Sequence, residues 1–403
     1  MPNIVIIGAG ASGMAAAIAA SAESENRVTL FERQARVGRK LLATGNGRCN
    51  LTNTAASPEN YHGADRDFVR CVLEEYPPSK VLEFFRSLGL VTREEHGGRV
   101  YPMSDSASSV LDVLRLGLEK ANIELLTGTQ VLSVKRDGPG FAVTWDGGKL
   151  HAHKLIIACG SCAGAKLGGG MSGYELLGSL GHSRTALYPS LTQIRTVPDY
   201  PRAMKGVRCD ALVSIMRGGE LLAEERGDLL FTETGISGTA VFSLSRVAAS
   251  AGRGLDAVID FFPDMTAAEL EKLLAARRAL SPSLPANQVF TGTVHSRVGQ
   301  MICKAAGVSG GVDVSALDRG RISALAEMAK AFTLPITGVS GFESAQVAAG
   351  GISTAEFNPA TLESRIVPGL FACGEVLDVD GDCGGYNLQW AWASGLRAGR
   401  LGR

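Results

Sequence analysis

The residues near the N-terminus whose types and spacing could support chemistry are Gly8, Gly10 and Gly13, followed by Glu32. The glycines form a Gly-x-Gly-x-x-Gly motif directly after the apolar run 4–7, and an alanine-rich stretch with helical periodicity follows them. A strand, a tight turn and a helix in this order leave the helix N-terminus facing an anion. Glu32 ends the next apolar run, at the place where a ribose hydroxyl would need a hydrogen-bond acceptor. The pattern predicts a dinucleotide site within a βαβ unit.

A second group of potential ligands lies in residues 36–53. Glycines alternate there with the cations Arg39, Lys40 and Arg48 and with several asparagines. The segment has neither a helical nor a strand period, so we expect a loop that offers backbone donors and positive charge to an anionic partner. A solvated surface loop is the alternative interpretation.

The C-terminal part of the chain also combines an apolar run, a glycine-rich stretch and a helix. The apolar run 370–373 ends in Gly374 and Glu375, and an acidic, glycine-rich stretch then leads into a final helix that reaches about residue 401. This arrangement predicts a second helix N-terminus that faces an anion. Nucleotide-binding features therefore stand at both ends of the chain, and the middle is expected to be an insertion.

Four cysteines have positions that could matter for chemistry. Cys159 and Cys162 have the Cys-x-x-Cys spacing of a redox pair, but they follow a strand, so two buried thiols are the favoured interpretation. Cys49 and Cys383 lie in the glycine-rich motifs, and Cys383 precedes a helix start. A proton-donating or covalent role for Cys383 is one hypothesis, and small-residue packing is the other.

Other candidate motifs carry less weight. The spacing of Gly168, Gly170 and Gly173 repeats Gly-x-Gly-x-x-Gly, but no acidic residue stands about twenty positions later, so we expect a turn before a helix rather than a nicotinamide site. The six histidines show no metal-ligand spacing, and no metal is expected. Ser237 lies between a predicted strand and a predicted helix and is a binding candidate rather than a nucleophile.

The elements that must position these residues divide into three parts. Residues 1–189 and 345–403 carry the α/β pattern, residues 190–264 and 333–344 carry short β-type runs that indicate a small barrel or sandwich, and residues 265–332 carry three amphipathic helices that suggest a cap. Forty basic residues balance forty acidic ones, which disfavours nucleic acid as a partner without excluding it. Neither an apolar run of membrane-spanning length nor a leader is seen, so we expect a cytoplasmic protein.

Four segments together resemble a known family. They are GAGASG with Glu32, GRKLLATGNGRCNLTN at 38–53, GDLLFTETGISG at 227–238, and GEVLDVDGDCGGYNLQWAWASG at 374–395. The chain is similar over its whole length to the BaiN/YhiN-like flavoproteins of the two-dinucleotide-binding-domain superfamily. The resemblance implies an α/β, Rossmann-type FAD-binding domain with an inserted β-barrel and a helical cap, with the insertions covering the flavin face.

The resemblance also implies residue roles. The glycine motif would hold the pyrophosphate, Glu32 the adenosine ribose and Val131 the adenine through its backbone, while the helix after Gly385 would place a positive dipole near the flavin ring. The full set of implied cofactor-binding residues is Gly8, Gly10, Ala11, Ser12, Gly13, Glu32, Arg33, Arg39, Lys40, Asn46, Arg48, Cys49, Asn50, Val131, Gly160, Gly374, Glu375, Asp378, Gly385, Tyr386, Asn387 and Leu388.

The function that these features favour is an FAD-dependent reductase. Reduced flavin would pass a hydride to an activated C=C bond of a small molecule, with an unsaturated 3-oxo steroid or bile acid as the candidate implied by the resemblance, after reduction by transiently bound NAD(P)H. Cys383, Arg48 and Ser237 are the catalytic candidates. A small-amine oxidase, an RNA-modifying enzyme that reduces uridine in ribosomal RNA, and a non-catalytic flavin-binding module are the alternatives. The oligomeric state, the preferred nicotinamide and the substrate stay open.

Overall fold

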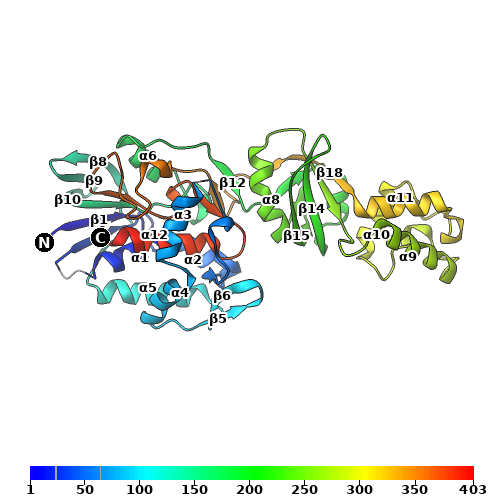
Figure 1. Ribbon diagram of the computed structural model, residues 1–403, viewed down its shortest axis with the longest axis horizontal. Helices are drawn as coiled ribbons and strands as arrows, with labels where there is room; N and C mark the ends of the chain where they lie inside the picture. Colours follow the sequence, from blue (N-terminus) through cyan, green and yellow to red (C-terminus); the bar gives the residue numbers. More distant parts are fainter. Residues whose placement is uncertain (23–24, 64) are drawn as a thin grey trace. The chain divides into compact units, whose positions relative to one another are not determined.

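The computed structural model describes residues 1–22, 25–63 and 65–403. The chain forms two compact units (Figure 1): one comprises Met1–Tyr188 and Gln346–Arg403, and the other comprises Pro189–Ala345. The first unit is therefore built from both ends of the chain, and the second is a continuous insertion.

A parallel five-stranded sheet forms the centre of the first unit. Its strand order is β20 (Leu370–Ala372), β11 (Lys154–Ile157), β1 (Asn3–Ile7), β2 (Arg27–Phe31) and β7 (Glu124–Leu126). The strands are short, and β1, β2 and β20 are largely buried apolar runs, as parallel strands covered on both faces require. The order places the late strand β20 two positions from β1, and the expected Rossmann-type fold is confirmed.

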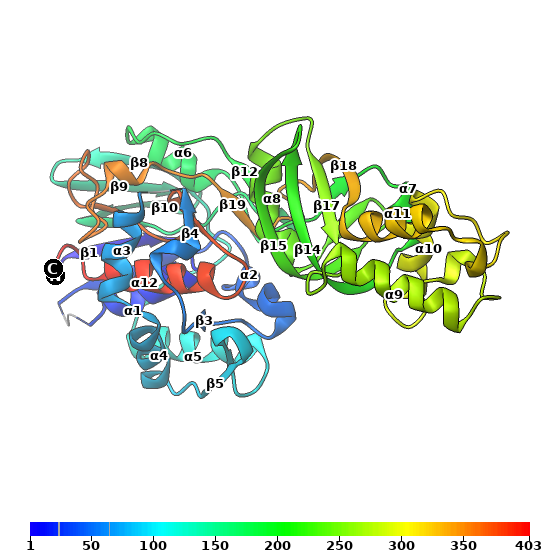
Figure 2. The same ribbon diagram turned by 45° about the vertical axis from the view of Figure 1, so that its right-hand side comes forward.

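The helices α1 (Ala11–Ala20) and α12 (Tyr386–Gly399) pack on one another although they come from opposite ends of the sequence, as both ribbon views show (Figures 1 and 2). Two glycines of α12 permit this approach. A Cβ at Gly395 would overlap the carbonyl oxygen of Ser12, and a Cβ at Gly399 would lie 2.6 Å from the carbonyl oxygen of Ala16. The contact between backbones brings the C-terminal helix onto the N-terminal one.

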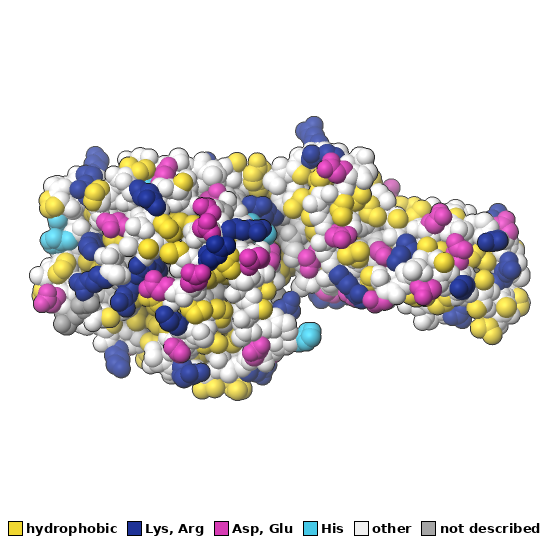
Figure 3. Space-filling view, in the orientation of Figure 1, with side chains coloured by type: hydrophobic (Ala, Val, Ile, Leu, Met, Phe, Trp, Pro, Cys, Tyr) yellow, Lys and Arg dark blue, Asp and Glu magenta, His cyan; other side chains and the backbone are white. Residues whose placement is uncertain are grey.

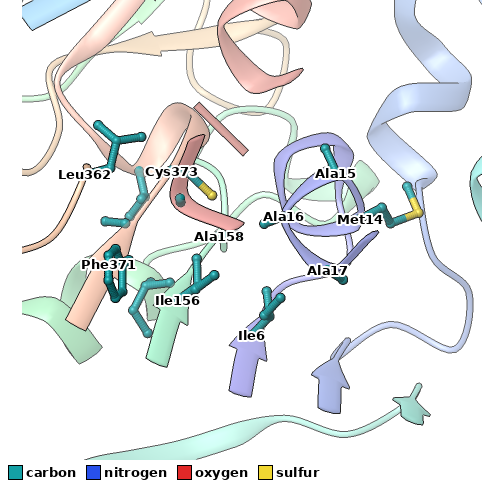
Figure 4. Close-up of a cluster of buried hydrophobic side chains, with 14 of the residues drawn as sticks. Ile6, Met14, Ala15, Ala16, Ala17, Ile156, Ala158, Leu362, Phe371 and Cys373 are labelled. Atoms are coloured by element: carbon teal, nitrogen blue, oxygen red, sulfur yellow. The ribbon is translucent and has the colours of Figure 1, made fainter. Parts of the chain in front are cut away.

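The core beside these helices is apolar and densely packed. Figure 4 shows Ile6, Ile156 and Phe371 from three neighbouring strands, together with Met14 and the alanines of α1. The alanines keep α1 close to the sheet because they have no side chain beyond Cβ. This packing fixes the start of α1 relative to the strand ends.

Smaller elements surround the sheet. The strands β8 (Val131–Asp137), β9 (Gly140–Trp145) and β10 (Gly148–Ala152) form a meander whose first turn is a hairpin at residues 137–140. A second small sheet contains β3 (Thr52–Asn53), β6 (Arg99–Pro102) and β5 (Thr92–Glu95), and a third contains β4 (Tyr61–Gly63) and β21 (Val379–Gly381). The helices of this part are α3 (Arg66–Glu75), α4 (Pro78–Ser87), α5 (Ala107–Lys120) and α6 (Ser172–Ser179).

The expectation that residues 36–53 form a loop is wrong for residues 39–43. Arg39–Ala43 form a short helix, α2, and Thr44–Gly47 form the 3₁₀ turn η1. Leu41 supplies the reason, because its side chain is buried in the core and gives this short segment an apolar anchor. Further along, Gly45, Asn46, Gly47 and Cys49 have positive φ, so the backbone of residues 45–49 is irregular.

The second unit contains a closed six-stranded barrel. Its strands follow the order β13 (Ile194–Thr196), β16 (Gly235–Ser237), β15 (Glu220–Phe231), β14 (Arg208–Arg217), β17 (Asp256–Asp260) and β18 (Phe332–Val339). Buried residues that alternate along these strands, such as Val213, Ile215 and Phe231, belong to one hydrophobic core. The barrel is therefore a packed scaffold rather than a pore.

Helices complete the second unit. They are α7 (Asp199–Ala203), α8 (Thr239–Ser250), α9 (Ala267–Leu280), α10 (Ser296–Ala305) and α11 (Arg319–Lys330). Helix α9 begins with a capping box in which Thr266 and Glu269 satisfy each other's backbone amides. Leu270 and Leu274 of α9 and Leu325 of α11 join the core that also contains the barrel interior.

Two properties bear on function. Within the described ranges 1–22, 25–63 and 65–403, no helix combines the length and apolar character that crossing a bilayer requires. In the same ranges no three His, Cys, Asp or Glu side chains gather as a metal site would need.

Candidate flavin and substrate site

The N-terminus of α1 is built to receive phosphate. A Cβ at Gly13 would overlap the carbonyl oxygen of Gly8, so the third glycine of the motif is required by packing. Gly10, in contrast, faces open space in which a Cβ would meet no atom within 4 Å. The first helical hydrogen bond runs from Met14 N to Gly10 O, 3.0 Å, which leaves the preceding amides without a helical acceptor. An open cradle of amide donors fits the pyrophosphate of a dinucleotide.

Glu32 lies at the end of β2, beside this cradle. Its Oε2 accepts a hydrogen bond from Ala9 N at 2.9 Å, and its Oε1 accepts one from Gln34 N at 2.8 Å. Each carboxylate oxygen can accept a second hydrogen bond, so the group is held in place and can still bind a ribose hydroxyl. Val131 begins β8 nearby, since Thr129 N donates to Glu32 O at 2.9 Å.

Two predicted cations, Arg33 and Arg39, lie around the same strand ends. Arg33 donates to Gly168 O, and Arg39 donates to Gln34 Oε1 at 2.6 Å and to Lys166 O at 3.0 Å. Neutral acceptors therefore orient these two guanidinium groups without cancelling their charge. In the second glycine-rich segment, residues 168–171 form the expected turn before a helix, which is α6, and Gly168 helps to hold Arg33.

Glu375 connects two further predicted residues. Its carboxylate forms a salt bridge with Lys40 and accepts a hydrogen bond from Ser161 Oγ at 3.4 Å. Gly160 lies beside it, since a Cβ there would be 3.9 Å from Glu375 Oε2. The turn η8 (Gly374–Val376) begins at Gly374, whose missing Cβ makes room for the Ser12 hydroxyl. Ser12 therefore directs its side chain toward the end of β20, and its contribution to phosphate binding would come from its amide.

Arg48 is held by charged neighbours. Its guanidinium contacts Glu95 Oε1 at 2.6 Å and Asp105 Oδ1 at 2.6 Å, and it stacks over the Tyr101 ring at 4.0 Å from the centroid. The hydrogen bonds to Glu95 and Asp105 raise the pKa of Arg48, and those from Arg48 lower the pKa of both carboxyl groups. These contacts favour a role in shaping the 44–50 turn over a guanidinium that points freely at a ligand.

Cys49 and Asn50 follow in the same turn. The Cys49 thiol is buried, and burial raises its pKa to about 12, so it is a poor nucleophile. Asn50 Oδ1 is buried and makes no hydrogen bond to the described residues, and a Cβ at Gly385 would lie 2.9 Å from it. A buried carbonyl oxygen without a donor at the start of α12 fits an N–H group on the edge of a bound flavin ring.

The loop before α12 is held from several sides. Asn53 Nδ2 donates to Gly384 O at 3.0 Å, and Asn387 Oδ1 accepts from Gly381 N at 2.8 Å. Asn387 therefore uses its side chain to fix the loop, and Gly385, with φ of 101°, caps the helix. Partly exposed Cys383 lies between these anchored residues.

The remaining predicted residues lie around this loop. Tyr61 Oη donates to Tyr386 O at 3.0 Å, and the two rings meet edge to face. Asp378 accepts a hydrogen bond from Thr185 Oγ1 at 3.0 Å. Leu388 lies in the first turn of α12, where its amide precedes the first amide that donates within the helix, Gln389 N to Gly385 O. The first unit thus brings the N-terminal and C-terminal candidates to one edge of the sheet.

Four candidates remain, which are Ser237, Cys159, Cys162 and Asn46. Ser237 ends β16 in the second unit, one residue before Gly238, which caps α8. Cys159 and Cys162 are free thiols, and burial raises the pKa of both, that of Cys159 to about 12. Exposed Asn46 has φ of 55° and shapes the 44–50 turn.

The sequence analysis missed His62 and Asp382. Their side chains lie 2.8 Å apart, next to Cys383. No motif marks His62, and only the pairing of β4 with β21 brings the two residues together.

Comparison with known proteins decides the family. The profile of the HI0933-like protein Rossmann domain matches residues 2–401. The chain belongs to the HI0933-like family. It is 41% identical, over 99% of its length and 98% of the relative, to the 3-dehydro-bile acid delta(4,6)-reductase of Clostridium scindens. It is 30% identical to the ribosomal RNA dihydrouridine synthase of Escherichia coli, covering 97% of this chain and 96% of the relative.

A solved structure supports the fold. The open conformation of a flavocytochrome c3 fumarate reductase aligns with a TM-score of 0.50 at 16% identity, covering 100% of this chain and 77% of that one. The family expected from the sequence motifs is confirmed, and so is the expectation of an FAD-dependent oxidoreductase.

Proposed function

We propose that this enzyme reduces an activated C=C bond of an unsaturated 3-oxo steroid or bile acid, using FAD that NAD(P)H reduces. The observation that carries the proposal is the 41% identity, over nearly the full length of both chains, to a bile acid delta(4,6)-reductase. The open amide cradle at Gly10 and the buried Asn50 oxygen support the cofactor part of the proposal independently.

The chain's own groups would hold FAD along the strand ends. The first-turn amides of α1 would bind the pyrophosphate with Arg39 nearby, Glu32 would bind the ribose, and the backbone at Val131 would meet the adenine. Glu375 and Asp378 would bind the ribityl chain. Asn50 and the first amides of α12 would hold the ring edge, and the positive end of that helix favours negative charge there. Bound FAD supplies the hydride-transfer chemistry.

On the substrate side, the candidates have unequal structural support. Cys383 is partly exposed on an anchored loop, which suits a residue that contacts the substrate. Arg48 is tied to Glu95 and Asp105 and would act by fixing the 44–50 turn. Ser237 lies in the second unit, and its role as a binding residue stays a prediction.

Reduction of a uridine in ribosomal RNA is the second candidate, because the Escherichia coli relative at 30% identity carries that name. Charge argues against it. Residues 189–345 contain sixteen basic and sixteen acidic residues, and the visible face of the molecule mixes both signs (Figure 3). RNA binding draws on clustered positive charge, so this balance of charges favours the small-molecule substrate.

The cofactor site is tested by Gly10→Ala. The new methyl group would occupy the open space of the cradle without clashing with protein, so we expect the fold to keep its stability while the Kd for FAD rises by roughly 10- to 100-fold. Equilibrium titration of the apoprotein with FAD measures this change. Gly178→Ala, at an exposed helical glycine with equally open space, is the matched control and should bind FAD normally. An unchanged Kd for FAD in Gly10→Ala would show that the pyrophosphate does not bind beside Gly10.

The reaction is tested with the FAD-loaded enzyme under anaerobic conditions. We expect NADH or NADPH to bleach the flavin, and a 3-oxo-4,6-diene steroid to restore its colour with formation of the reduced steroid. Rapid reoxidation by air after photoreduction, without bleaching by either nicotinamide, would indicate an oxidase instead. Salt-sensitive RNA retention together with turnover on ribosomal RNA would favour the second candidate.

A further inference from the structure

The strands β4 and β21 bring a histidine and a carboxylate together beside the loop that precedes α12. His62 Nε2 lies 2.8 Å from Asp382 Oδ1, and Asn60 Nδ2 donates to Asp382 Oδ2 at 3.2 Å. Each oxygen of the carboxylate therefore has its own partner. The pair is separated by more than three hundred residues in sequence, so only the fold creates it.

The backbone around this pair is fixed. Asp382 N donates to Asn60 O at 2.9 Å, and the β4–β21 register places His62 opposite Asp380. Asn387 Nδ2 donates to Gly381 O at 2.7 Å, which ties the loop to the first turn of α12. An imidazole held in this way keeps one orientation, as a group that transfers a proton must.

Both side chains remain accessible. The side chain of His62 is 38% exposed and that of Asp382 is 32% exposed. His62 can therefore exchange protons with solvent, whereas the side chain of His182 is fully buried. His62 also lies next to the segment 381–385, which carries Cys383 and leads to the helix start that fits the flavin ring.

We propose that His62, oriented by Asp382, supplies the proton that completes reduction of the C=C bond; this inference rests on the function proposed above. The hydride adds to one alkene carbon with two electrons from the reduced cofactor, and the π electrons shift toward the conjugated carbonyl. The other carbon then takes the proton from Nδ1–H of the imidazolium ring, whose Nε2–H stays on Asp382, and the neutral imidazole that results recovers a proton from water. The cofactor is oxidised, the substrate gains H⁻ and H⁺, and no further reactant is required.

The test separates proton transfer from electron transfer. Three FAD-loaded variants are compared with the wild type: His62→Gln, Asp382→Asn and Cys383→Ser. Each protein is photoreduced anaerobically and then mixed with a 3-oxo-4,6-diene steroid or with ferricyanide. Ferricyanide accepts electrons without protonation of a carbon atom. We expect flavin reoxidation by the steroid to slow about 10²- to 10⁴-fold in His62→Gln and less in Asp382→Asn. The rate of flavin reoxidation by ferricyanide should stay within about twofold of the wild-type rate. The exposed-histidine control His96→Gln should stay within the same limit.

A second measurement does not depend on turnover. Diethyl pyrocarbonate is applied to the oxidised holoenzyme with and without the steroid, and modified peptides are quantified by mass spectrometry. We expect the steroid to protect His62 and to leave His96 reactive. Unchanged labelling of His62 would place it away from the substrate and overturn the inference.

The outcomes distinguish the two proposals. If the steroid reoxidises the wild type and His62→Gln equally fast, the role of His62 is overturned while the reductase function stands. A larger loss in Cys383→Ser than in His62→Gln would assign the proton to the thiol and also overturn the inference. If the steroid reoxidises no form of the enzyme, the proposed function fails, and the inference fails with it.

Discussion

At the scale of single residues, burial decides which thiols can react. Burial raises the pKa of Cys49 to about 12, and burial with the nearby charge of Glu32 does the same for Cys159. At pH 8 the thiolate fraction of each would be about 10⁻⁴. We expect iodoacetamide to leave both unlabelled in the native enzyme and to label them after unfolding in urea, as peptide mass spectrometry would show. A native disulfide between Cys159 and Cys162 would instead support the redox-pair hypothesis.

His182 illustrates a second effect of burial. Its Nδ1 lies 2.8 Å from Glu356 Oε2, and its Nε2 lies 3.0 Å from the Ser364 hydroxyl, whose oxygen already accepts two backbone N–H groups. The neutral ring, with Nε2 as the acceptor, suits these contacts. Burial lowers the pKa of His182 below its ordinary value, although the hydrogen bond to Glu356 opposes that shift.

The lowered pKa predicts a pH dependence of stability. The folded state binds fewer protons at His182 than the unfolded state, so its contribution to stability is present above about pH 6.5 and is lost as the pH falls below that value. We expect the urea concentration at the unfolding midpoint of the wild type to decrease when the pH is lowered from 7.5 to 5.5. His182→Gln should be less stable at pH 7.5 by about 1–3 kcal/mol and should lose less on acidification. Parallel pH profiles for both proteins would contradict this assignment.

At the scale of elements, the contact between α1 and α12 joins the two ends of the chain. Gly395→Ala would force a methyl group onto the Ser12 carbonyl, so we expect a loss of about 1–3 kcal/mol in the free energy of unfolding. Gly178→Ala, at an exposed position of α6 with open space, should be neutral or stabilise by up to about 1 kcal/mol. Urea unfolding of the apoproteins measures both changes. Equal stability of the two variants would show that α12 can move away from α1.

The elements also show what the sequence could predict. Helices are predicted within residues 265–332 because their periodicity is a local signal, and α9 (Ala267–Leu280) is one of them. Strands such as Thr52–Asn53 and Tyr61–Gly63 were missed, since two or three residues carry no period and gain their form from distant partners. The glycine motif could be found from sequence because its spacing is local. The pair of His62 and Asp382 could not, because the two residues are distant in sequence and only the fold brings them together.

At the scale of the whole molecule, the insertion has the properties of an independent folding unit. Residues 189–345 have their own hydrophobic core, which includes the barrel interior and the helices α9–α11. The ends of the segment meet within the barrel: β13 pairs with β18 through Ile194 and Val339, and Ser340 N donates to Gln193 O at 2.9 Å. A segment whose ends lie together can interrupt another fold without distorting it.

We therefore expect residues 189–345, expressed alone, to fold cooperatively and to bind no FAD, because the first unit contains both helix N-termini that fit the cofactor. Circular dichroism during urea titration should give one sigmoidal transition, and hydrogen exchange should protect the same barrel amides as in the intact chain. The intact apoprotein is the control for both measurements. Failure of the fragment to fold, with the intact chain folded under the same conditions, would show that the barrel depends on the first unit. Tight FAD binding by the fragment would move the cofactor site into the insertion.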